Sequence, residues 1–278
     1  MAGTLYVVGT PIGNLGDLSP RALQTLQDVD FIAAEDTRVT LKLLNHFSIK
    51  KPMISYFEHN KLQRGDVICT RIEAGENCAL VTDAGMPAIS DPGEDLIRQC
   101  AQRGIQAVVV PGPSAVVSAL ALSALPTGRF TFEGFLSMNK KSRREHLAQL
   151  QEETRTMVFY EAPHKLPHTL EDLYQTFGDR RLSIVRELTK VHEQVIRTTL
   201  KDAVQHYAQG QLKGELVLVI EGKPQEQPQP CPFDQALLLA QEYVEQGMSA
   251  SEAAKTAAKS TGLKKGDLYK ALQNGKQP

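Results

Sequence analysis

The stretch LYVVGTPIGNL, residues 5–15, joins a short apolar run to a loop rich in glycine and proline. Such a run is typical of a buried strand, and a helix is expected after the loop at 19–27, where Ser19 is a good N-cap and Pro20 suits the first helical position. Further strands are expected at 31–34, 53–56, 79–82 and 107–110, with a helix at 61–74. This alternation predicts a largely parallel sheet covered by helices.

A second α/β unit follows the first. Its strands are expected at 130–135, 156–160, 183–187, 195–198 and 215–220, with helices near 143–151, 163–177 and 200–209. We therefore predict an α/β fold with two α/β domains, the first over residues 1–113 and the second over residues 114–222.

The last part of the chain has a different composition. The run KPQEQPQPCP, residues 223–232, is rich in proline and glutamine, which is typical of an extended linker. A small helical domain is expected beyond it, over 233–278. Three helices are predicted in it. The first spans 233–246, the second begins at the capping box formed by Ser249 and Glu252, and the third spans 264–272.

A turn at 260–262 separates the last two of these helices, which is the order of a helix-turn-helix motif. Lys264, Lys265 and Lys270 would decorate the last helix, and they favour RNA binding over the alternative, a three-helix appendage that only packs. The sequence leaves both readings open.

The overall composition is that of a globular protein without a strong charge. The 278 residues include 31 basic and 32 acidic side chains, so the net charge of −1 does not indicate a nucleic-acid partner. Local basic clusters exist nevertheless, and they are candidates for RNA binding: Lys140, Lys141, Arg143, Arg144 and Arg186.

The sequence also disfavours several kinds of site. The four cysteines have no CxxC spacing and no histidines at ligand spacing, so we expect reduced thiols, no disulfide and no metal. No apolar run approaches a membrane span, and the N-terminus lacks the pattern of a secretory signal. These features predict a cytoplasmic protein.

Each predicted strand end in the first unit, except the third, carries a loop of polar, glycine and proline residues. In open α/β sheets, ligands bind outside the carboxyl ends of the strands, so these loops predict a binding site. The first loop does not match the glycine spacing of a dinucleotide site, and Pro11 removes an N–H that a phosphate would need. The expected ligand therefore lacks phosphates.

Six motifs make a more specific identification possible. They are, in order, GTPIGNL (9–15), AEDTR (34–38), LVTDAGMPAISDPG (80–93), PGPSA (111–115), FYEAPHK (159–165) and RELTK (186–190). Together they resemble the bacterial family of 16S ribosomal RNA cytidine ribose 2′-O-methyltransferases, which has the tetrapyrrole-methylase fold. The resemblance spans residues 4–222, and the tail is similar to the helix-turn-helix module of many members.

The resemblance implies a homodimer that binds S-adenosylmethionine in the cleft between its two α/β domains. It also implies 16S rRNA as the substrate, expected in the assembled small subunit, with free RNA as the open alternative. The cofactor-binding segments of the family map onto Thr10, Pro11, Ile12, Asp83, Ala84, Gly85, Met86, Ile89, Ser114, Ala115, Tyr160, Glu161, Gly214 and Glu215. Related methylases carry Gly-Asp-Pro where this chain has Gly85-Met86-Pro87, so the role of Asp83 is open.

Transfer of a methyl group to a ribose hydroxyl needs a group that removes the hydroxyl proton or lowers its pKa. The charged loops offer Asp17, Glu35 and Arg186 as wider candidates, and the four preferred catalytic residues are Asp36, Arg38, Glu187 and Lys190. The alternative for Asp36 and Arg38 is an ion pair that only orders the loop. Arg186 and Lys190 are also suited to hold an RNA phosphate.

Two other functions fit the same fold, because fold alone does not settle the substrate. One is methylation of a tetrapyrrole precursor, which the AEDTR and RELTK motifs and the basic tail disfavour. The other is an RNA- or ribosome-binding protein without catalysis, which the intact loop motifs disfavour.

Overall fold

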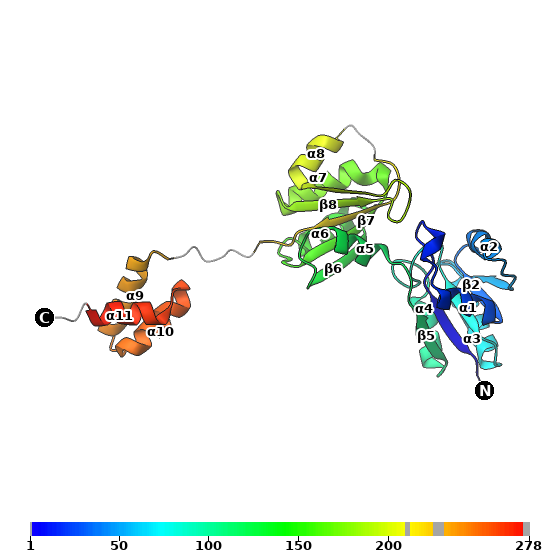
Figure 1. Ribbon diagram of the computed structural model, residues 1–278, viewed down its shortest axis with the longest axis horizontal. Helices are drawn as coiled ribbons and strands as arrows, with labels where there is room; N and C mark the ends of the chain where they lie inside the picture. The colour runs from blue at the N-terminus through cyan, green and yellow to red at the C-terminus, as the bar shows by residue number, and fades with distance from the viewer. Residues whose placement is uncertain (1, 209–211, 225–230, 275–278) are drawn as a thin grey trace. The chain divides into compact units, whose positions relative to one another are not determined.

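The computed structural model describes residues 2–208, 212–224 and 231–274. The chain forms two compact units, Met1–Lys223 and Pro224–Pro278 (Figure 1). Residues 225–230, most of the predicted linker, lie outside the described residues. The predicted boundary at residue 113 falls inside the first unit, where it separates two sheets.

The first sheet has the strand order β3-β2-β4-β1-β5, and every described pairing in it is parallel. Its strands are β1 (Thr4–Val8), β2 (Phe31–Ala34), β3 (Met53–Ser55), β4 (Cys78–Val81) and β5 (Gln106–Val110). The predicted parallel sheet is therefore present, and its strand ends differ from the predicted ones by one residue at most.

Helices cover both faces of this sheet (Figure 1). Those of one face are α3 (Lys61–Glu73) and α4 (Glu94–Gln102), and those of the other are α1 (Pro20–Asp28) and α2 (Thr37–His46). The Ser19 hydroxyl accepts the N–H of Ala22 and Pro20 begins α1, which is the predicted cap. With both faces buried, β2 and β4 are apolar at every position.

The second sheet has the strand order β6-β7-β10-β8-β9 and is mixed. Its strands are β6 (Phe130–Phe135), β7 (Thr156–Glu161), β8 (Arg181–Arg186), β9 (Gln194–Thr199) and β10 (Leu216–Ile220). β6 and β7 are parallel, whereas β10 pairs antiparallel with both β7 and β8. The last residue of β7 therefore lies beside the first residue of β10, with Glu161 opposite Leu216.

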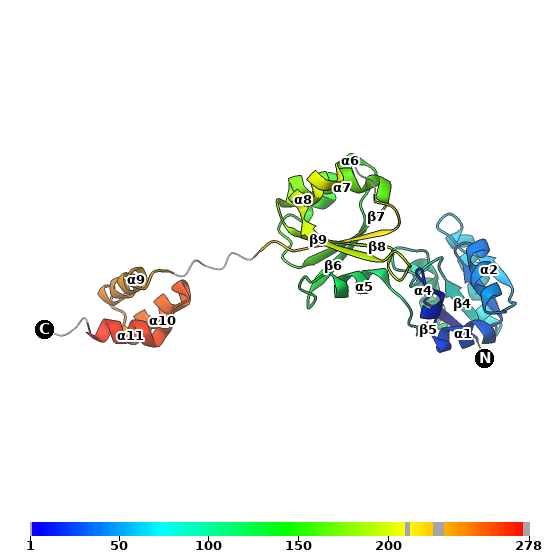
Figure 2. The ribbon, with the colours of Figure 1, turned by 45° about the horizontal axis from the view of Figure 1, so that its top comes forward.

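One face of the second sheet is covered by α6 (Lys140–Gln149), α7 (Leu166–Phe177) and α8 (Leu200–Tyr207) (Figure 2). The other face is covered by α5 (Ala115–Leu122), which follows the first sheet directly along the chain. Ile12 from the first loop joins the core under α5, so the two sheets share buried side chains.

The second unit contains α9 (Phe233–Glu245), α10 (Ala250–Thr261) and α11 (Lys265–Asn274). The predicted capping box is present, because the side chains of Ser249 and Glu252 each bond the backbone of the other residue. Ala253, Ala254 and Ala257 are fully buried. The predicted turn at 260–262 is shorter than expected, since α10 continues to Thr261 and ends on left-handed Gly262.

Candidate functional site

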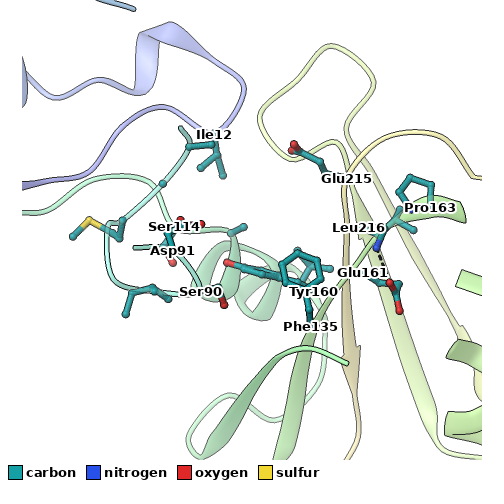
Figure 3. A pocket seen from close by; sticks show the side chains of 17 residues that line it. Ile12, Ser90, Asp91, Ser114, Phe135, Tyr160, Glu161, Pro163, Glu215 and Leu216 are labelled. Atoms are coloured by element: carbon teal, nitrogen blue, oxygen red, sulfur yellow. Dashed lines mark hydrogen bonds between the residues drawn. The ribbon is translucent and has the colours of Figure 1, made fainter. Parts of the chain in front are cut away.

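A cavity of about 330 Å³ lies where the edges of the two sheets meet (Figure 3). The carboxyl ends of β1, β4 and β5 form one side through their loops, and the ends of β6 and β7 with the start of β10 form the other. Its lining residues are Ile12, Ala84, Gly85, Met86, Ile89, Ser90, Asp91, Ser114, Ala115, Phe135, Tyr160, Glu161, Ala162, Pro163, Glu215, Leu216 and Val217.

Two glycines bring the loops after β1 and β5 into backbone contact. A Cβ placed on Gly9 would lie 2.6 Å from the Cα of Gly112, and one on Gly112 would lie 2.8 Å from the backbone of Gly9. Any larger residue at either position would push the two loops apart. The glycine-rich composition of both loops is therefore required by how closely they approach.

Thr10 and Gly85 fasten the first loop to the loop after β4. The N–H of Thr10 donates to the carbonyl of Gly85 at 2.9 Å, and the N–H of Gly85 donates back at 3.1 Å. The Thr10 hydroxyl, which is buried, donates to the carbonyl of Thr82 at 3.1 Å. These bonds hold Ile12 and Ala84 on the same side of the cavity.

Carboxylates gather on the first sheet's side of the site. The backbone N–H of Asp36 donates to Asp83 at 3.1 Å, and the hydroxyl of Thr82 donates to Glu35. Burial and the neighbouring Glu35 raise the pKa of Asp91 to about 6. The same two causes raise the pKa of Asp83. Of these acids, only Asp91 lines the cavity.

Aromatic side chains form the opposite wall. The Tyr160 ring meets the rings of Phe132 and Phe135 at centroid distances of 5.0 and 5.4 Å. Its hydroxyl points across the cavity toward the Ser90–Asp91 segment (Figure 3). Burial, and then the charge of Asp91, raise the pKa of Tyr160 to about 12, so the phenol stays protonated.

The RELTK loop joins the two sides of the site. Lys190 Nζ donates to Glu187 at 2.9 Å and to Glu215 at 3.2 Å. Burial opposes the charge of Lys190, but these carboxylates raise its pKa, and the bond from Lys190 lowers the pKa of Glu187. A Cβ on Gly13 would lie 2.5 Å from Lys190 Cγ, so the first loop packs directly on this loop.

Strained backbone is concentrated in two of these loops. Four of the six described non-glycine residues with left-handed φ are Ala88, Ser90, Glu187 and Thr189, with φ between 52° and 68°. Each such residue costs about 1–3 kcal/mol, and strain of this kind clusters at functional sites.

Most of the residues predicted to bind the cofactor face one cavity. Ten of them line it: Ile12, Ala84, Gly85, Met86, Ile89, Ser114, Ala115, Tyr160, Glu161 and Glu215. The other four do not: Thr10, Pro11, Asp83 and Gly214. Thr10 holds two loops together, and Gly214 leaves room for Glu187, whose carboxylate a Cβ at position 214 would overlap.

The four residues predicted to be catalytic lie outside this lining. Asp36 caps α2 and pairs with Arg38, whose hydrogen bonds hold the pKa of Asp36 at about 2. Glu187 and Lys190 do not line the cavity, but each forms a hydrogen bond with Glu215, which does. Their catalytic roles stay predictions.

Sequence reasoning did not assign seven residues that line the cavity: Ser90, Asp91, Phe135, Ala162, Pro163, Leu216 and Val217. Ser90 and Asp91 belong to the motif LVTDAGMPAISDPG, but they lie several residues beyond the end of β4. The sequence therefore does not indicate that they reach the cavity. Leu216 and Val217 could not be placed because the antiparallel direction of β10 was not foreseen.

The residues predicted to bind RNA lie on several elements. Lys140, Lys141, Arg143 and Arg144 are on α6, where Arg143 pairs with Asp172 of α7. Arg186 donates to the carbonyl of Lys213 at 3.1 Å and to Gln194 at 3.0 Å. Lys264, Lys265 and Lys270 are exposed at the start and along α11.

The charge of the cavity favours a cation. Its lining holds three acidic residues, Asp91, Glu161 and Glu215, and no basic residue. Glu161 is only 5% exposed and accepts bonds from the Thr169 hydroxyl and the Ala162 N–H. Over residues 2–208, 212–224 and 231–274, no cluster of acidic, histidine or cysteine side chains has the geometry of a metal site, and no helix is long and apolar enough to span a membrane.

Comparisons with known proteins agree with this architecture. A family model described as tetrapyrrole (corrin/porphyrin) methylases matches residues 4–204. A protein of Synechocystis sp. named ribosomal RNA small subunit methyltransferase I is 46% identical over 271 residues, covering 96% of each chain. Its namesake in Bacillus subtilis is 41% identical, covering 97% of this chain and 94% of that protein.

Among solved structures, uroporphyrin-III-C-methyltransferase from Thermus thermophilus superposes on this chain with a TM-score of 0.56. The superposition covers 80% of this chain and 94% of that one, at 20% sequence identity. At this identity the likeness concerns the fold alone.

Proposed function

Because the chain belongs to the tetrapyrrole methylase family, among its ribosomal RNA small subunit methyltransferase I members, we propose that it methylates the ribose 2′-hydroxyl of a cytidine in 16S ribosomal RNA. It is an S-adenosylmethionine-dependent methyltransferase with the two-domain tetrapyrrole-methylase fold followed by a helical domain. The observation that carries the proposal for the site is the acidic cavity between the two sheets.

The cavity suits S-adenosylmethionine in size and in charge. A volume of about 330 Å³ is within the range of small-molecule sites, and the acidic lining complements a sulfonium and an ammonium group. When bound, S-adenosylmethionine supplies an electrophilic methyl group. Ile12, Met86 and Tyr160 would hold it by apolar contact, and Ser114 and Glu215 by polar contact. The loops would also exclude water from the reacting atoms.

Asp91 is the group in the cavity best suited to remove the proton of the ribose hydroxyl. That hydroxyl is a weak nucleophile until its proton leaves. With a pKa of about 6, Asp91 is mostly ionised at pH 7 and still basic enough to accept a proton. We assign the ion pair of Asp36 and Arg38 to the rim of the site, where the Arg38 side chain is 87% exposed and can meet an RNA phosphate.

The two alternative functions are less well supported. The relatives at 41–46% identity are named as ribosomal RNA methyltransferases, whereas the uroporphyrin methyltransferase structure shares only 20% identity. A non-catalytic RNA-binding protein would not need a cavity of this size and charge at the sheet edges.

The direct test is transfer of a labelled methyl group to undermethylated small subunits, followed by mapping of the modified nucleotide. We expect one ribose of a cytidine in 16S rRNA to carry the label. Label on a base, or on a tetrapyrrole precursor supplied in parallel and not on RNA, would refute the proposal.

Removing the helical unit, residues 224–278, tests its part in RNA binding. We expect the affinity for small subunits to fall on the order of tenfold, the size of a few lost phosphate contacts from Lys264, Lys265 and Lys270. Binding of S-adenosylmethionine, measured by calorimetry, should not change, because the cavity lies wholly within the first unit. Unchanged affinity for subunits would leave the unit with a packing role only.

We further propose that the enzyme is a cytoplasmic homodimer that acts on the assembled small subunit without a metal. Val109 on β5 and Val117 on α5 are each 53% exposed, and they are candidates for the contact with a second copy. The buried cysteines Cys69, Cys78 and Cys100 are free thiols, as expected in a reducing compartment.

A further inference from the structure

A second cavity, of about 410 Å³, lies between α6 and the start of α7. We call it the basic groove and define it by Lys140 and Arg144 on one wall and His164, Lys165 and His168 on the other. The ion pair of Arg143 and Asp172 ties the two helices together within it. The Arg143 guanidinium is thereby already paired with a carboxylate of the protein.

The groove also contains Glu171, whose carboxylate lies 3.9 Å from His168 Nδ1, but within the described part of the chain its three remaining lysine and arginine side chains have no acidic partner. Among the residues that the structure describes, Lys140, Arg144 and Lys165 form no ion pair, whereas Lys141 on the same helix pairs with Glu145 at 3.9 Å. Lys140 and Arg144 are exposed, and Lys165 is half-buried. Three cations that line one groove between two helices are suited to bind an anion.

The basic groove and the acidic cavity are lined by neighbouring residues of the same segments. Pro163 lines the acidic cavity (Figure 3), and the next two residues along the chain, His164 and Lys165, line the groove. Phe135 lines the acidic cavity at the end of β6, and Met138, three residues on, lines the groove. A chain with a nucleoside at one site would place its neighbouring phosphates at the other.

We propose that the basic groove binds the backbone phosphates of single-stranded RNA next to the nucleotide that is methylated. This inference rests on the proposed function and adds the path of the substrate. It also gives Lys165, His164 and His168 a role in positioning the substrate. RNA is favoured over a protein partner because the uncompensated charge is positive and the groove adjoins the site of transfer.

The test compares a Lys140→Ala/Lys165→Ala variant with a Lys140→Arg/Lys165→Arg variant, which keeps both charges. For the alanine variant we expect a KM for undermethylated small subunits about tenfold higher, with kcat nearly unchanged. The slope of log affinity against log salt for a single-stranded RNA oligonucleotide should decrease by about 1.4, or about 0.7 per lost contact. Lys50→Ala, at the opposite edge of the first sheet, controls for general charge.

The arginine variant should retain the salt slope of the wild type. An alanine variant with the KM and slope of Lys50→Ala would overturn the proposal, as would a fall in kcat at constant KM. Weaker binding to subunits with unchanged binding to the oligonucleotide would also overturn it, since the groove would then contact a ribosomal protein. If the wild type methylated no RNA, the proposed function would fail, while oligonucleotide binding would still test the groove.

Discussion

The Asp91→Asn variant should lose about 100-fold or more in kcat, the contribution typical of a general base, with a much smaller loss of affinity for S-adenosylmethionine, because Glu161 and Glu215 keep the cavity acidic. Asparagine preserves the shape of the side chain but cannot accept the hydroxyl proton. In the wild type, kcat/KM for the cofactor should fall about tenfold per pH unit below pH 6, since the pKa of Asp91 in the free enzyme is about 6. Steady-state transfer to small subunits at varied cofactor concentration measures both effects.

Asp28→Asn is the matched control, because Asp28 is exposed and lies at the end of α1, at the opposite edge of the first sheet. It should leave kcat and the pH dependence of kcat/KM unchanged. Wild-type kcat in Asp91→Asn would remove Asp91 as the base. A weaker affinity for S-adenosylmethionine at unchanged kcat would instead assign Asp91 to cofactor binding.

Asp91→Asn, which lowers kcat, should raise the free energy of unfolding above pH 6. Well below the unfolded pKa of 3.8, Asp91 is protonated in both the folded and the unfolded chain and contributes no difference. Between this pH and about 6 the unfolded chain has released the proton while the folded chain still holds it, so stability falls across this interval and stays lower at higher pH. After allowance for solvent screening, Asp91→Asn should be about 1 kcal/mol more stable than the wild type at pH 8, measured by urea unfolding.

Gly112→Ala should lower the free energy of unfolding by about 2–3 kcal/mol and weaken S-adenosylmethionine binding at least about tenfold. The added methyl group would lie 2.8 Å from three backbone atoms of Gly9, its Cα, C and O. A flexible side chain could move away, but backbone on both sides cannot do so without separating the two loops. Those loops carry Ile12 and Ser114, which both line the cavity.

Gly128→Ala provides the control, since a Cβ there meets no heavy atom within 4 Å and the backbone is not left-handed. It should keep the stability and the cofactor affinity of the wild type, or become slightly more stable. Thermal unfolding and calorimetry compare the two variants. Equal behaviour of Gly112→Ala and Gly128→Ala would show that the loops are not held at the distance seen here.

Residue patterns close in sequence predicted the parts of the fold that depend on local structure. Ser19 and Pro20 predicted the start of α1, and Ser249 with Glu252 predicted the start of α10. The apolar runs predicted the strands within one or two residues, because their length and polarity are local properties. The mixed order of the second sheet was not predictable, since pairing direction depends on contacts between distant segments.

The candidate site was also predicted only in part from local sequence patterns. Loops rich in glycine and proline at the strand ends indicated a cofactor site, and ten of the fourteen residues assigned from their motifs line one cavity. The exceptions show the limit of motif reasoning. Thr10 and Gly214 belong to the motif segments but serve the packing of loops, and Asp83 is directed to the backbone of Asp36.

By itself, the sequence determined the strand-and-helix order, the family and the loops that form the site, because these follow from local patterns and from the order of motifs. Only the tertiary structure decided which side chains of those loops meet. Asp91 acquires its raised pKa from burial and from Glu35, which lies on another strand end. The groove beside the cavity likewise needs α6 and α7 side by side. Both depend on through-space electrostatics and packing between residues far apart in the chain.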